Sequence, residues 1–105
     1  MRWRTPKLVL VRTTIGSQHE AAALASRLMD GGAACVHLQE ARSFYRWKGE
    51  RRDESEWIVE ARTTPGGEDE ARRIMGENHP YDIPIIEAWN VRVNEEYFEW
   101  VGSDK

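Results

Sequence analysis

Hydrophobic residues recur along this chain at two spacings, one typical of strands and one typical of helices. Residues 7–14 form a short apolar run rich in β-branched side chains, which predicts a central strand buried on both faces. Ser17 and Glu20 then have the spacing of an N-terminal capping box. Apolar residues follow at helical spacing up to the glycine pair at 31–32, so we expect a helix between these two signals.

The middle of the chain alternates as strands do. Residues 34–38 predict a strand, residues 39–42 interrupt the pattern as a bulge would, and the alternation resumes over 43–48. Gly49-Glu50 has the composition of a hairpin turn, and the return strand is expected over residues 53–63. One side of that strand carries Trp57, Val59 and Ala61, and the other carries Glu56, Ile58, Glu60 and Arg62.

The last third contains a second helix, a stiff connector and a fourth strand. Residues 68–75 place acids before arginines, the order that a helix dipole favours. His79-Pro80-Tyr81-Asp82-Ile83-Pro84 follows, and its two prolines restrict the backbone to extended conformations. Residues 85–93 predict a strand, after which Asn94 caps a short helix. The apolar residues of that helix are Tyr97, Phe98, Trp100 and Val101.

This order of elements is that of the ferredoxin-like α+β fold, a βαββαβ sandwich with an antiparallel sheet, extended here by a C-terminal helix. We expect one domain over residues 1–105, with a core at about 7–101 and flexible ends at 1–6 and 103–105. Two helices leave one sheet face bare, and large apolar side chains on it, including some of the five tryptophans, would form an interface. The hairpin is also longer than two helices need. We therefore expect an oligomer whose sheets pack together.

Composition excludes several classes of function. The net charge of −3, without a basic block, argues against a nucleic-acid partner. No apolar run approaches the length of about 20 residues that spans a membrane, and no apolar signal core follows the first charges, so we expect a cytoplasmic protein with no membrane partner. Cys35 is the only cysteine, which excludes an internal disulfide. The sequence has no P-loop, GxSxG or GxGxxG motif, and the apolar surroundings of Cys35 disfavour a nucleophilic thiolate, so we do not expect an enzyme.

Several motifs together carry a family resemblance. They are Ala33-Ala34-Cys35-Val36, Ser43-x-Tyr45-x-Trp47-Lys48-Gly49, Glu56 ahead of Arg62-Thr63, the connector from His79 to Pro84, and Tyr97-Phe98-Glu99-Trp100-Val101. On these stretches, nearly the whole chain, it resembles the CutA divalent-cation tolerance proteins. The resemblance implies a cytoplasmic trimer with its sheets around a threefold axis, linked to tolerance of divalent metals, copper above all, and it implies no known reaction. The chain departs from the family at Arg62, where Lys is frequent, at Asp82, where Glu is usual, and in its short second helix.

Metal ligands are the first candidate chemistry. Cys35, His37 and His79 lead, followed by Glu56 and Asp82. A thiolate with an imidazole suits copper or zinc, although no CxxC, HxH or HExxH cluster is present. Cys35 and His37 share a strand face with backbones roughly 7 Å apart, so they meet at one ion only if their side chains converge. In the alternative interpretation Cys35 is a small buried residue and His79 binds backbone carbonyls.

A cleft between subunits is the second candidate. Tyr45, Trp47 and Tyr81 are expected to line it, and the residues expected at its rim are Lys48, Glu56, Arg62 and Asp82. The alternative is that these aromatic residues only pack an interface. Three functions stay open: a trimeric, non-catalytic protein that binds copper or other divalent cations, a signalling trimer that binds a small anionic ligand in this cleft, and a structural assembly module.

Overall fold

The computed structural model describes residues 1–3, 7–103 and 105. Its elements, in order, are β1 (Leu8–Ile15), α1 (Gln18–Asp30), β2 (Cys35–Trp47), β3 (Glu50–Thr63), the 3-10 turn η1 (Pro65–Gly67), α2 (Glu68–Glu77), β4 (Ile86–Val91) and α3 (Glu95–Val101). The expectation of flexible ends falls partly on residues 4–6 and 104, which lie outside this description. Within the described residues, no helix has the length and apolar character needed to cross a membrane.

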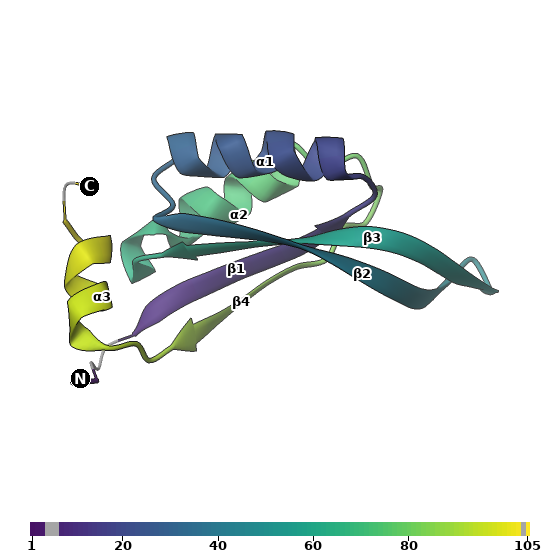
Figure 1. Cartoon of the computed structure of the whole chain (residues 1–105). Helices are drawn as coiled ribbons and strands as arrows, with labels where there is room; N and C mark the ends of the chain where they lie inside the picture. The colour runs from purple at the N-terminus through teal and green to yellow at the C-terminus, as the bar shows by residue number, and fades with distance from the viewer. Residues whose placement is uncertain (4–6, 104) are drawn as a thin grey trace.

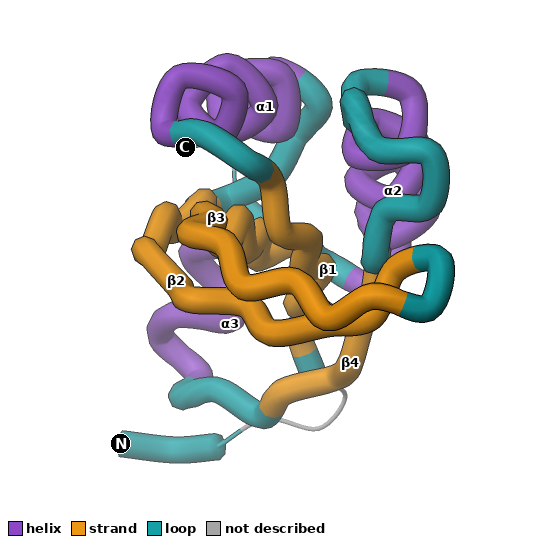
Figure 2. Tube along the Cα trace, turned by 90° about the vertical axis from the view of Figure 1, so that its right-hand side faces the viewer, coloured by secondary structure: helices purple, strands orange, loops and turns teal. Residues whose placement is uncertain are grey.

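The four strands form one antiparallel sheet in the order β2-β3-β1-β4. Helices α1 and α2 lie on one face of it, and α3 lies on the other side at the end where the N-terminus is found (Figures 1 and 2). This arrangement confirms the predicted α+β fold, βαββαβ with a C-terminal helix. We call the face opposite α1 and α2 the open face.

The core lies between the sheet and its two covering helices. Alternate residues of the central strands point into it, as the period of a strand requires. Its buried members are Val9, Val11, Ile15, Val59 and Ala61 from the sheet, Ala21, Leu24, Leu28, Ala71, Ile74 and Met75 from the helices, and Ala33 from the loop before β2. The predicted division of residues 56–62 between two faces is therefore confirmed. A smaller cluster around Leu8, Ala34 and Val101 packs α3 against one end of the open face.

Local signals explain where the first and last helices begin. The Ser17 hydroxyl accepts a hydrogen bond from the Glu20 backbone N–H at 3.1 Å and donates to the Glu20 carboxylate at 2.9 Å, so the predicted cap of α1 is confirmed. Asn94 occupies the N-cap position of α3 as expected, although its side chain makes no capping hydrogen bond.

Three predicted details of the hairpin are wrong. Strand β2 is continuous through residues 39–42, because its pairing with β3 runs one-to-one from Cys35 opposite Arg62 to Trp47 opposite Glu50. Polar residues there do not signal a bulge, since β2 is an edge strand and much of it faces solvent. The turn is Lys48-Gly49, not Gly49-Glu50, with φ of 52° and 81°. Two positive φ angles match the twist of a two-residue hairpin, and β3 therefore begins at Glu50 rather than at residue 53.

The hairpin projects well beyond the body of the molecule, which measures 47 × 24 × 21 Å (Figure 1). The pairing of β1 with β3 ends at Ile15 opposite Trp57, so within the part of the chain that the structure describes, residues 41–56 pair only with one another. A two-stranded ribbon is at best marginally stable alone. The base of this ribbon, next to the connector that precedes β4, is where several of the candidate side chains gather.

Candidate functional site

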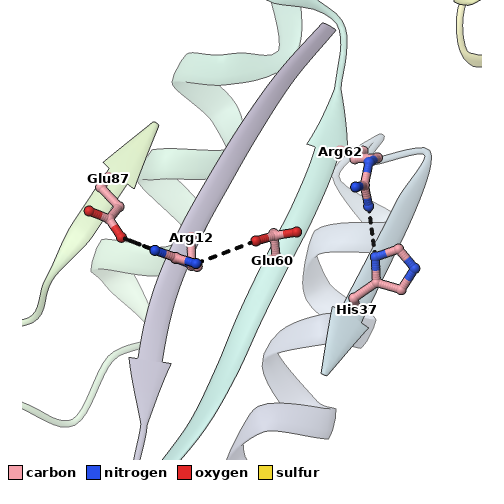
Figure 3. A network of polar contacts seen from close by, with 5 residues as sticks. All are labelled: Arg12, His37, Glu60, Arg62 and Glu87. Carbon is pink, nitrogen blue, oxygen red and sulfur yellow. Dashed lines mark hydrogen bonds and ion pairs between the residues drawn. The ribbon is translucent and has the colours of Figure 1, made fainter. Parts of the chain in front are cut away.

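A row of charged residues crosses the centre of the open face. Strand register aligns His37, Glu60, Arg12 and Glu87 across all four strands. The Arg12 Nε and Nη2 atoms each donate to Glu87 Oε1 at 3.0 Å, and Nη1 lies 3.8 Å from Glu60 Oε2 (Figure 3). The Arg12 guanidinium also lies 4.9 Å from the ring centre of Trp89. The open face therefore carries an exposed tryptophan, as expected, but its centre is polar rather than apolar.

Beside this row, Arg62 and Cys35 both approach the His37 ring. Arg62 Nη1 lies 2.7 Å from His37 Nδ1, and Cys35 Sγ lies 3.7 Å from His37 Nε2. A guanidinium only donates hydrogen bonds, so Nδ1 must accept. The proton of the neutral ring is therefore on Nε2, the nitrogen that faces the sulfur.

Helix α3 closes one side of this group. Burial, and next the neighbouring Cys35, raise the pKa of the Tyr97 hydroxyl above its usual value. The ring of Tyr97 stacks at 5.6 Å on that of Trp100 in the same helix. Tyr97 therefore stays protonated at neutral pH, as a hydroxyl near the sulfur. Cys35 itself is only partly buried.

His79 lies elsewhere and makes two backbone contacts. Its Nε2 lies 2.8 Å from the Thr14 carbonyl oxygen, and the Tyr81 backbone N–H donates to its Nδ1 at 3.2 Å. A carbonyl only accepts and an N–H only donates, so the proton is on Nε2 and both ring nitrogens are engaged. The ring also packs edge-on against Tyr81, with centroids 4.6 Å apart. His79 therefore links the connector to Thr14 at the end of β1. Thr14 is four residues along that strand from Leu10, which shares the cross-strand partner Arg62 with Cys35.

Glu56 is a buried carboxylate held by the connector. Its relative exposure is 6%, and its Oε2 accepts a hydrogen bond of 2.6 Å from the Tyr81 hydroxyl. Burial first, and then the Glu56 hydrogen bond, raise the pKa of Tyr81 well above its usual value. Tyr81 is therefore a neutral donor over the whole physiological range. Asp82, the next residue of the connector, is exposed.

A cleft of about 940 Å³ opens beside this pair, and we call it the hairpin cleft. Residues 42–47 of β2, with Arg52, Glu54 and Glu56 of β3, form one wall, and Tyr81 to Ile83 of the connector form the other. Tyr45, Trp47 and Tyr81 therefore share one cleft, to which Asp82 also contributes. Lys48 lies at the hairpin turn, 5.8 Å from the ring of Trp47, and Arg62 lies on the open face, so neither lines it.

The structure brings together some of the predicted metal candidates and separates others. The side chains of Cys35 and His37 lie next to each other, whereas Glu56 and Asp82 line the hairpin cleft. His79 lies against the Thr14 carbonyl at the end of β1. Among residues 1–3, 7–103 and 105, no group of three or more His, Cys, Asp or Glu side chains could hold a metal ion. Sequence reasoning did not single out Arg12 or Glu54. A charge inside an otherwise apolar run, after Leu8 to Val11, was the available signal for Arg12.

Comparison with known proteins gives consistent results. The family model described as CutA1 divalent ion tolerance protein matches residues 9–104. The divalent-cation tolerance protein CutA of Thermotoga maritima is 32% identical over 96 residues, covering 90% of this chain and 95% of that protein. The structure of CutA from Synechococcus elongatus PCC7942 superposes with a TM-score of 0.86 at 30% identity, covering 93% of this chain and 90% of that one. The periplasmic divalent cation tolerance protein CutA from Archaeoglobus fulgidus also gives a TM-score of 0.86, at 28% identity, covering 90% of this chain and 95% of that one.

Proposed function

Since the chain belongs to the CutA1 divalent ion tolerance family, we propose that it is a trimeric, non-catalytic protein that binds copper or another divalent cation through Cys35 and His37. The observation that carries this proposal is the distance of 3.7 Å between Cys35 Sγ and His37 Nε2. A tetrahedral metal with bonds of about 2.3 Å to sulfur and about 2.1 Å to nitrogen holds those two atoms about 3.6 Å apart. The two ligand atoms are therefore already at the spacing that one ion requires.

The remaining ligands would come from water or from another copy of the chain. His79 is a poor third ligand, because both its nitrogens are hydrogen-bonded to the backbone. Glu56 is held by Tyr81 at the hairpin cleft, and Asp82 lies beside it. The proposal therefore rests on Cys35 and His37. Assembly of three chains around a threefold axis, with their sheets facing one another, would bring three Cys35–His37 pairs onto the facing surfaces.

The trimer is supported by what a single chain leaves uncovered. Residues 41–56 form an unsupported ribbon, and Trp89 on the open face is 37% exposed. The ion pair between Arg12 and Glu87 joins side chains that are 36% and 42% exposed, so in a monomer it stabilises little, about 0–1 kcal/mol. A second sheet packed on this face would cover Trp89 and this ion pair, and a contact along the free edge of β2 would support the ribbon.

Titration calorimetry with Cu(I), Cu(II) and Zn(II) tests the metal site. We expect saturable binding by the wild-type chain, loss of it in Cys35→Ala and His37→Gln, and no change in the control His19→Gln, which alters an exposed histidine in α1. A wild-type dissociation constant weaker than about 100 μM, or equal binding by the Cys35→Ala variant, contradicts the proposal. Light scattering after gel filtration tests the trimer, and a monomer at micromolar concentration contradicts it.

The predicted cytoplasmic location is part of the same proposal and is tested by cell fractionation. The relative from Archaeoglobus fulgidus is described as periplasmic, so an envelope fraction is the contradicting outcome. The anionic ligand considered from the sequence is not favoured, because Glu54 and Glu56 face the hairpin cleft without an ion-pair partner among the described residues.

A further inference from the structure

The hairpin cleft is lined by two carboxylates, Glu54 and Glu56, that form no ion pair within the described residues. Glu56 accepts one hydrogen bond, at Oε2, while Oε1 accepts none within the part of the chain that the structure describes. Glu54 has the Tyr45 hydroxyl as its neighbour, and that contact helps to raise the pKa of Tyr45, after burial. No arginine, lysine or histidine nitrogen of the described residues forms an ion pair with either carboxylate. A buried carboxylate in this condition is costly unless a positive charge or further donors reach it.

The arginines of the lining are occupied or point away. Arg42 binds Asp53 through two hydrogen bonds, and Arg52 lies 3.6 Å from Glu50. Arg46 is exposed and adjacent to Tyr45 on β2, so the two side chains leave the strand on opposite faces. On the side of the cleft that Glu56 occupies, the uncompensated charge is therefore negative.

Aromatic rings stand beside these carboxylates. Tyr45 and Tyr81 both line the cleft, and each lies close enough to Glu56 for its charge to raise the pKa of the phenol. Trp47 adds further apolar surface on the same face. Neutral aromatic faces combined with a carboxylate are the recognition chemistry of organic ammonium groups.

A metal ion suits this cleft less well. The carboxylates are not part of any group of three or more potential ligands in the described residues. The volume of about 940 Å³ is also that of a small-molecule site rather than of an ion site.

We propose that the hairpin cleft binds a small organic cation with an ammonium group, whose charge pairs with Glu56 and Glu54 and whose carbon atoms pack on Tyr45 and Tyr81. Glu56 Oε1 is the unpaired acceptor to which the charge is directed. The site is separate from the Cys35–His37 pair, which lies on the part of the open face next to α3. Its occupation therefore does not depend on the metal-binding proposal.

Calorimetric titration of the full chain with choline tests this, using 3,3-dimethyl-1-butanol as the probe of the same shape without the charge and propionate as the anionic probe. We expect choline to bind at least about tenfold more tightly than either, the difference that one ion pair of about 1.4 kcal/mol supplies. The comparison uses only the wild-type protein, so it does not depend on the folding of a variant. Equal binding of choline and the neutral alcohol, or tighter binding of propionate, overturns the proposal.

Variants then locate the site. We expect Glu56→Gln to weaken choline binding about tenfold or more, and the control Glu77→Gln, on the surface of α2, to leave it within about twofold. An equal effect of both substitutions overturns the assignment to this cleft. A trimer in which a lysine or arginine of another copy pairs with Glu56, with no choline binding up to about 10 mM, also overturns it, because the charge is then satisfied within the assembly.

Discussion

Replacing Arg62 with methionine is expected to strengthen metal binding at Cys35 and His37. Arg62 Nη1 contacts His37 Nδ1 at 2.7 Å and so keeps the proton on Nε2, the atom that a metal beside Cys35 must use. A neutral imidazole that binds metal through Nε2 carries its proton on Nδ1, where it would oppose the guanidinium. Metal binding therefore has to break the contact with Arg62.

The size of the effect follows from that contact. A hydrogen bond to a charged group contributes about 1.5–3 kcal/mol, and the lower end applies because this contact is exposed. A release of about 1.4 kcal/mol corresponds to a tenfold gain in affinity. Methionine keeps much of the aliphatic stem of arginine but removes the charge and the donor. Lysine at position 62 can still donate one hydrogen bond, so Arg62→Lys should fall between the two.

Competition between the protein and a chromophoric zinc chelator at pH 7 measures the change directly. Arg27→Met is the matched control, since it removes one positive charge from an exposed position in the last turn of α1, on the other face of the sheet. An unchanged or weaker zinc affinity in Arg62→Met refutes the reasoning, because Arg62 would then support the ligands rather than compete with the metal. An equal gain in zinc affinity in the Arg27→Met variant would show that the effect comes from net charge alone.

Three further predictions concern stability. Tyr81→Phe leaves the buried carboxylate without its hydrogen bond and should lower the free energy of unfolding by about 1–3 kcal/mol in denaturant titrations, more than Tyr45→Phe does. Because the pKa of Tyr81 is raised in the folded state, its contribution is complete below the unfolded value of about 10 and declines as pH rises above it, so Tyr81→Phe should lose less stability between about pH 9 and 11 than the wild type. Gly67→Ala would press a methyl group against the buried Thr63 side chain, so it should lower the melting temperature by several degrees, whereas Gly66→Ala, with more space, should not.

The order of elements and the two strand faces could be predicted because they depend on local periodicity. The continuity of β2 could not, since an edge strand exposed over much of its length tolerates polar residues that would interrupt a buried one. A helix capped by Ser17 and ended by two glycines carries its own boundary signals. The outer part of the hairpin carries no such boundary signal in its sequence, except at its turn.

The position of that turn explains why the predicted faces are correct although the predicted turn implies other cross-strand partners. A two-residue turn at Gly49-Glu50 would pair Lys48 with Arg51, whereas the observed turn pairs Trp47 with Glu50. The difference shifts the register by two residues. A shift by an even number leaves every side chain on its face but changes the residue opposite it. The residues around His37 could therefore be identified only from the three-dimensional structure.

Metal binding and assembly, as proposed, use the same surface and cannot be independent. His37 stands at one end of the row formed with Glu60, Arg12 and Glu87, directly opposite Glu60 on β3. In water these half-exposed charges interact weakly, but a second sheet packed over them would strengthen each interaction and raise the cost of any unpaired charge. A cation bound at His37 would add positive charge at the end of that row and displace Arg62 from its place beside it. The free energy of assembly must then change when metal binds, and by reciprocity the metal affinity must differ between the monomer and the assembled protein by the same factor.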